Sequence, residues 1–293
     1  MPQPKLAVWN LPPADFFLSG ASSGAAELPY EVERTDPRSC EERLRTGEAD
    51  VALLPTTRIL RHPGDYDVLS AVALSSWTYP YARLVLKNGL RGSTRTVATH
   101  PDDAQEAFLA RIFLKEHYDL TLDFVSHEGS LRERLDAGED AALLVGKDVP
   151  TLQIEKGLAL DVGQEWYEMA QYPMVWGLFA TRKDEADPDM IRTLRGVAEA
   201  AEEHRGMWLQ SREMPEPLHN FYAESMRLRL GRLATASLTE LREHFFYYEV
   251  TDEVPDVPFI YLPDDEQDSE DGGGYGLDDG DDDRPGLRRQ LFG

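Results

Sequence analysis

Short runs of β-forming residues alternate with segments of helical periodicity along most of the chain, and this alternation constrains the fold more than any other feature. The first series of predicted elements has strands at residues 5–9, 51–54, 72–74 and 83–86 and helices at 41–46 and 56–60. The second series has strands at 96–99, 121–125, 141–145, 158–162 and 174–180 and helices at 104–117, 131–137 and 164–170. A helical region fills residues 188–246. Strands that alternate with helices predict an α/β protein.

Two such series with a long helical C-terminal region favour a hinged protein of two lobes, although a doubly wound single domain has a similar pattern. In a hinged fold the chain leaves the first lobe, builds the second and returns. Residues 86–91 and 178–182 are extended runs that pass into polar stretches, as a hinge requires. The predicted lobes are residues 1–88 with 181–262, and residues 89–180.

The charge of the chain is strongly negative, with a formal net charge of −24. This field repels polyanions, so DNA and RNA are excluded as partners. Residues 263–293 contain a run of acids without apolar anchors, and we expect a disordered tail there. The alternative is an interaction tail ending in RRQLFG.

The body without this tail still carries a large acidic surplus, and its basic residues are mostly arginine. This pattern indicates a halophilic cytoplasm, where salt screens self-repulsion. Cys40 is the single cysteine, which fits a reducing compartment. We predict a cytoplasmic protein without membrane association, because the sequence has no run of about 18 apolar residues and no signal peptide.

Short catalytic motifs give little support to other enzyme classes. Residues 20–24 spell G-x-S-x-G, but no strand precedes and no helix follows, as a nucleophile elbow would need. His127 and Glu128 lack the second histidine of H-E-x-x-H, so we expect no metal site. GGGYG lies in the acidic tail and is read as a linker.

Longer segments carry a family resemblance. Residues 161–180, DVGQEWYEMAQYPMVWGLFA, resemble the D-L-G-E-x-W-x-x-x-T-G-x-P-F-V-x-A-x-W-A block of the chorismate dehydratase family of the futalosine route to menaquinone. Residues 47–76 are similar to its E-x-D-V-A-L-x-P-S-x-E-Y-L segment, residues 141–150 to its L-L-I-G-D segment, and residues 236–250 to its C-terminal helix. The resemblance covers most of residues 4–262.

This resemblance implies a two-lobed, periplasmic-binding-protein-like fold of type II, used as an enzyme. The implied reaction removes water from chorismate to give 3-[(1-carboxyvinyl)oxy]benzoate. Because aromatisation of the ring drives the elimination, the protein mainly has to orient the substrate and exclude water. The implied partner is a small carboxylate substrate, and no cofactor or metal is expected.

Two candidate site residues follow from the family pattern. WNLPP at residues 9–13 is similar to Y-L-N-T-x-P, which makes Asn10 the candidate catalytic residue; the alternative is a turn-forming asparagine before prolines. Thr56 stands where the family has serine after the D-V-A-L-x-P strand. Its hydroxyl is expected either to bind a substrate carboxylate or to cap the next helix.

The chain departs from the family where the substrate is expected. In SSWTYPYAR, Ser76 is retained, while Arg83 replaces a serine and is expected either to clamp a carboxylate or to be a solvated edge residue. Asp102, Asp103, Ala104, Gln105 and Glu106 replace S-S-R-T-S at the start of a helix. Gln105 remains a candidate for substrate binding, but acids at a helix N-terminus repel an anion. Two alternatives stay open: a non-catalytic binder of a small anion, and the sister naphthoate synthase of the same pathway.

The acidic surplus predicts that the thermal stability of the protein rises with salt concentration. Screening weakens repulsion between the surface carboxylates of the folded chain. Melting temperatures measured from low to molar KCl should therefore increase. A melting temperature that stays constant across this series would contradict the halophilic interpretation.

Overall fold

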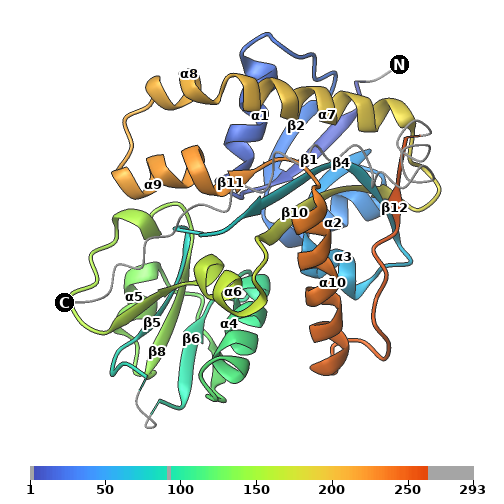
Figure 1. The fold of residues 1–293 in the computed structure, drawn as a ribbon. Helices are drawn as coiled ribbons and strands as arrows, with labels where there is room; N and C mark the ends of the chain where they lie inside the picture. The colour runs from blue at the N-terminus through green and yellow to red at the C-terminus, as the bar shows by residue number, and fades with distance from the viewer. Residues whose placement is uncertain (1–2, 91–93, 263–293) are drawn as a thin grey trace.

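The computed structural model describes residues 3–90 and 94–262, which form two lobes, each built on one β-sheet (Figure 1). The first sheet has the order β11-β4-β10-β3-β1-β2, and β12 pairs with β4. Its strands are β1 (Lys5–Trp9), β2 (Glu31–Thr35), β3 (Val51–Pro55), β4 (Tyr66–Ser76), β10 (Met174–Arg182), β11 (Met226–Arg227) and β12 (Phe259–Ile260). The second sheet has the order β7-β6-β8-β5-β9. Its strands are β5 (Ala82–Leu86), β6 (Thr96–Thr99), β7 (Asp123–Ser126), β8 (Ala141–Val145) and β9 (Leu158–Asp161).

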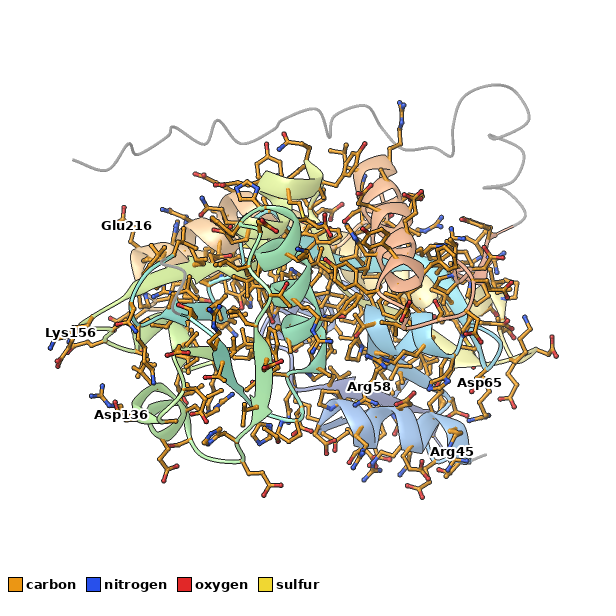
Figure 2. The ribbon with its side chains drawn as sticks, turned by 90° about the horizontal axis from the view of Figure 1, so that it is seen from below. Arg45, Arg58, Asp65, Asp136, Lys156 and Glu216 are labelled. Atoms are coloured by element: carbon orange, nitrogen blue, oxygen red, sulfur yellow. The ribbon has the colours of Figure 1, made fainter. Side chains whose placement is uncertain are left out.

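The helices lie against these sheets and between the lobes (Figure 1). Those of the first lobe are α1 (Ala14–Ser22), α2 (Pro37–Thr46), α3 (Thr56–Arg61), α7 (Pro188–Glu203), α8 (Arg205–Gln210), α9 (Glu216–Asn220), a π-helical turn (Phe221–Ser225) and α10 (Arg232–Tyr247). Those of the second lobe are α4 (Ala104–Glu116), α5 (Leu131–Asp136), a 3-10 turn (Val149–Thr151) and α6 (Val162–Ala170). Figure 2 shows Asp136 and Lys156 on one side of the molecule and Arg45 and Asp65 on the other.

Local sequence explains how the first lobe begins and ends its elements. Both β3 and the adjacent part of β1 are buried, so their apolar runs contact helices rather than water. Helix α2 starts at Asp36, whose carboxylate accepts a hydrogen bond from the Ser39 backbone N–H at 2.9 Å. It ends at Gly47, whose φ of 78° is a left-handed conformation that glycine adopts without steric cost. Strands β1, β2 and β3 pair in parallel, because α1 connects β1 to β2 and α2 connects β2 to β3.

Within residues 3–90 and 94–262, the chain passes between the lobes twice, ahead of β5 and ahead of β10. β5 pairs with β8 and β9 in the second sheet, and β10 pairs with β3 and β4 in the first. The crossings thus lie nearer the N-terminus than the boundaries at 88/89 and 180/181 that we expected from the sequence. The reason is that β5 already pairs in the second sheet and β10 already pairs in the first. The sequence analysis had placed the hinge in the polar residues that follow each of these strands.

Helix α10 fastens the first lobe to the second. Its Ser237 hydroxyl accepts a hydrogen bond from the indole N–H of buried Trp166 in α6 at 3.0 Å. The ring of Phe245 packs edge-on against Phe108 of α4, with centroids 4.8 Å apart. In Figure 1, α10 runs from the first sheet down beside α4 and α6. The C-terminal helical region therefore covers the lobe junction rather than one lobe alone.

The predicted fold class is confirmed, with two sheets, alternating helices and a helical C-terminal region. The predicted helical region 188–246 also contains β11, a two-residue strand that pairs with the end of β4. β4 itself is far longer than the strand predicted at 72–74. Its entire length is buried, so the sequence shows no alternation of polar and apolar residues that would mark the strand. Gly20 and Ser22 of the G-x-S-x-G run lie inside α1, so no nucleophile elbow forms there. The acidic tail expected from residue 263 lies outside the described residues.

The contact of α6 with the first crossing leaves no room for a side chain at Gly163. A Cβ there would lie 2.7 Å from the Tyr79 backbone nitrogen and 2.8 Å from the Thr78 carbonyl carbon. Gly163→Ala should therefore lower the free energy of unfolding by about 1–3 kcal/mol, as overpacking does. Chemical denaturation at constant salt measures this change.

Gly196 in α7 supplies the matched control, since a Cβ there meets no atom within 4 Å. Gly196→Ala should be neutral or stabilise by up to about 1 kcal/mol, because alanine favours a helix interior. Equal effects of the two substitutions would contradict the packing assigned to Gly163.

Candidate functional site

Asn10 and Thr56 lie at the same edge of the first sheet. β1 and β3 are parallel, and the pairing of Val8 with Leu53 places Asn10 level with Pro55. The Asn10 side chain is exposed, so its amide is available at this edge. The Thr56 hydroxyl is fully buried and donates to the Val175 carbonyl oxygen at 2.7 Å. Thr56 therefore holds β10 against α3 in this structure.

Gln105 joins the two lobes directly. Its side chain projects from the first turn of α4, in the second lobe, and is 3% exposed. The Thr57 backbone N–H of the first lobe donates to the Gln105 side-chain oxygen at 3.2 Å, and the Gln105 amide donates to the Trp176 carbonyl oxygen at 2.8 Å. Both ends of one amide thus bond across the lobe junction.

Ser76 supports the same junction through Trp176. The Trp176 indole N–H donates to the Ser76 hydroxyl oxygen at 2.7 Å, and that hydroxyl donates to the Thr78 carbonyl oxygen at 2.7 Å. Tyr79, on the first crossing, stacks on the Trp176 ring with centroids 3.8 Å apart. Ser76 therefore fixes the side chain of Trp176, the residue whose backbone carbonyl accepts the hydrogen bond from Gln105.

Arg83 lies in a different environment. It is half-buried in β5 and pairs across the sheet with Asp161. Asp161 accepts hydrogen bonds from the backbone N–H groups of Tyr79 at 2.7 Å and Gln164 at 2.9 Å. Burial raises the pKa of Asp161, and the charge of Arg83 partly offsets that effect. Among the described residues, no hydrogen bond connects Arg83 to Asn10, Thr56, Ser76 or Gln105.

The acids at the start of α4 are not the repulsive cluster that their sequence suggests. Asp103 forms a buried ion pair with Arg134, with 2.6 Å between Oδ2 and Nη1. Glu106 is 2% exposed, and its Oε1 has no hydrogen-bond partner. Burial, together with the neighbouring charge of Asp103, raises the pKa of the Glu106 carboxyl to about 8. Arg134 therefore balances the charge of Asp103, and the raised pKa favours the protonated form of Glu106 at neutral pH.

The sequence analysis named Glu106 only as part of an unfavourable cluster, yet its spacing held a signal. Leu109, Ala110 and Phe113 follow it by three, four and seven residues and are all buried. This spacing puts a carboxylate on the buried face of a helix. A buried carboxyl without a charged partner becomes neutral, and a neutral carboxyl donates a hydrogen bond.

The junction thus gathers polar groups from both lobes. Asn10 stands on the first lobe, Gln105 and Glu106 stand on the second, and the Thr57 N–H faces Gln105. All of these groups can donate hydrogen bonds at neutral pH. No group of three or more His, Cys, Asp or Glu side chains within residues 3–90 and 94–262 is arranged to hold a metal ion. No helix in this described part is long and apolar enough to cross a membrane.

Comparison with known sequences decides the family. The sequence profile of the family described as menaquinone biosynthesis matches residues 4–247. The chain belongs to the menaquinone biosynthesis family. This confirms the resemblance read from the blocks at residues 47–76 and 161–180. No curated protein matches the chain at a significant level.

Solved structures show the same fold at low sequence identity. A structural-genomics protein from Archaeoglobus fulgidus is 18% identical, with a TM-score of 0.63 over 84% of this chain and 98% of that one. A Candida albicans protein described as having the generic periplasmic binding protein fold is 13% identical, with a TM-score of 0.62 over 88% and 94%. The alkanesulfonate-binding protein SsuA from Xanthomonas axonopodis, bound to MOPS, is 13% identical, with a TM-score of 0.62 over 89% and 98%. The two-lobed, periplasmic-binding-protein-like architecture is therefore confirmed.

The raised pKa of Glu106 predicts a specific pH dependence of stability. Its folded-state value of about 8 lies above the ordinary 4.5. The contribution of Glu106 to the free energy of unfolding is therefore fully present below about pH 4.5 and is lost as the pH rises to about 8. Glu106→Gln stays neutral throughout. Its unfolding free energy should rise relative to the wild type across this window, by up to about 1.4 kcal/mol per pH unit.

Denaturant unfolding of both proteins at several pH values measures this difference. Glu203→Gln, at an exposed position in α7, is the control and should show no such slope. A pH-independent difference for Glu106→Gln would show that Glu106 is ionised in the folded protein at neutral pH.

Proposed function

We propose that this protein is a chorismate dehydratase-like lyase of menaquinone biosynthesis, which removes water from chorismate to give 3-[(1-carboxyvinyl)oxy]benzoate. The family match over residues 4–247 carries the proposal. The hydrogen-bond donors at the lobe junction support it, because chorismate presents two carboxylates that must be oriented. The negatively charged body makes such local donors more necessary.

Binding of the substrate replaces contacts that the lobes make with each other. In this structure the Gln105 amide oxygen accepts the hydrogen bond from the Thr57 N–H. In the complex, a substrate carboxylate oxygen would accept that hydrogen bond instead. The Gln105 amide would then donate to the same carboxylate rather than to Trp176. Asn10, at the adjacent sheet edge, donates to the second carboxylate. Arg83 is left out of this assignment because its cross-strand neighbour is Asp161.

Glu106 supplies the proton that the leaving group needs. Its neutral carboxyl donates a proton to the ring hydroxyl as the C–O bond breaks, and water forms. The electron pair of the adjacent C–H bond enters the ring, which becomes aromatic, and a substrate carboxylate accepts that proton. The proton then returns to the Glu106 carboxylate, so the net change is loss of one water molecule. The raised pKa of Glu106 keeps it in the acid form at neutral pH.

Incubation of the purified protein with chorismate in high salt, followed by product analysis, tests this function. We expect the wild type to form the aromatic product. Glu106→Gln should lower turnover by about 10²–10⁴-fold, the range for loss of a general acid, and should remove the fall in kcat/KM above about pH 8. Asn10→Ala should lower kcat/KM by about 5–150-fold, as loss of one hydrogen bond to the substrate does.

Glu203→Gln is the control and should retain wild-type turnover. Full activity of Glu106→Gln would remove the acid role and leave the reaction standing. Chorismate binding without any product would indicate the non-catalytic binder, and neither binding nor product in the wild type would overturn the proposed function.

A further inference from the structure

A cavity of about 540 Å³ lies where the C-terminal end of α10 meets Glu116 of α4, and none of the candidate site residues lines it. Its walls include the carboxylates of Glu116, Glu240 and Glu243 and the apolar side chains of Phe246, Tyr247 and Val254. Phe246 is 50% exposed, Tyr247 73% and Val254 42%. Half of the exposed large hydrophobic residues in the described part of the chain therefore line this one cavity.

The charge of the cavity is negative and its wall holds no lysine or arginine. The Tyr248 hydroxyl donates a hydrogen bond to the Glu116 carboxylate at 2.7 Å. His244 also lines the cavity, and burial lowers the pKa of its ring, which favours the neutral form. Carboxylates beside exposed aromatic rings favour a ligand that combines guanidinium groups with apolar side chains.

The chain carries a segment of that chemistry. Residues 287–292 read Leu-Arg-Arg-Gln-Leu-Phe, with two guanidinium groups between leucines and a phenylalanine. The intervening residues 264–283 are strongly acidic and are repelled by both the cavity and the acidic body. Charge complementarity therefore selects residues 287–292, and not the rest of this segment, for the cavity.

The intervening chain is long enough for residues 287–292 to reach the cavity. Val254, on the cavity wall, precedes the last described residue, Leu262, by eight positions, which span at most about 29 Å. Residues 263–286 supply a further 24 residues, which when fully extended span at most about 86 Å.

We infer that residues 287–292 bind in the acidic, aromatic cavity formed by α10, Glu116 and Val254 of the same chain. The two arginines contact the carboxylates of Glu116, Glu240 and Glu243, and the apolar side chains cover Phe246 and Tyr247. This covers an apolar patch that is otherwise open to solvent at the outer end of the helix that fastens the lobes together.

Paramagnetic relaxation tests this contact in the full chain. Cys40 is buried, and burial raises its pKa to about 12, so a thiol introduced by Gln290→Cys takes the nitroxide label selectively. The amide resonances of residues 240–254 should lose most of their intensity. The same label at Ser269→Cys, in the acidic link, should leave them much less affected. Arg288→Glu with Arg289→Glu should abolish the loss seen with the label at position 290.

Three results would overturn the inference. One is equal broadening from the labels at positions 269 and 290. Another is broadening that persists in the double glutamate variant. The third comes from mixing labelled chain without ¹⁵N with unlabelled ¹⁵N chain: broadening there of the strength seen within one chain would show that the cavity binds a second copy.

Discussion

The structure depends on the lobe junction, where the side chain of Gln105 from the second lobe forms hydrogen bonds with Thr57 and Trp176 of the first lobe. One amide accepts from Thr57 and donates to Trp176, and the Trp176 ring is itself held by Ser76 and Tyr79. These contacts link the start of α4 to the edge of the first sheet where β1 and β3 end. Every candidate functional group described here, apart from Arg83, belongs to this junction or borders it. The bonds are few and exchangeable, which suits a surface that a ligand has to enter.

The charges at the start of α4 explain how the chain can belong to the family although its sequence departs from the family pattern at this helix. Three acids stand in positions 102–106, but their effect depends on burial rather than on composition. Asp103 is paired with Arg134, and Glu106 is deprived of water and remains protonated. A helix start that reads as anionic is therefore able to donate hydrogen bonds. The same burial that raises the pKa of Glu106 supplies an acid suited to an elimination reaction.

Much of the fold was predictable because it rests on local patterns. The strands at 5–9, 51–54 and 141–145 are apolar runs between polar turns, and the structure places strands there. The long extent of β4 was missed, since a strand that is buried throughout shows no alternation. The position of the crossings was displaced because lobe membership is decided by pairing between strands distant in sequence. The role of α10 in joining the lobes depends on Trp166 and Phe108, far away along the chain.

The candidate site was predictable only in part. The family pattern pointed to Asn10 as a catalytic residue and to Thr56, Ser76 and Gln105 as substrate-binding residues. The structure gathers them at one junction, and these roles stay proposals. The family pattern also pointed to Arg83, which faces Asp161 instead. Glu106 was missed as a functional group, because the protonation state of a carboxyl depends on tertiary burial and on the pairing of Asp103 with Arg134.

The ionisation of Glu106 is the measurement that bears most directly on this account. ¹³C NMR of protein labelled at the glutamate carboxyl, with the Glu106 signal assigned by its absence in Glu106→Gln, follows that titration. The account predicts an apparent pKa of about 8 in the free protein, so that the carboxyl is protonated at neutral pH. A midpoint near the ordinary glutamate value of 4.5 would contradict it, because α4 would then present an anion to the substrate carboxylate and no proton to the leaving hydroxyl.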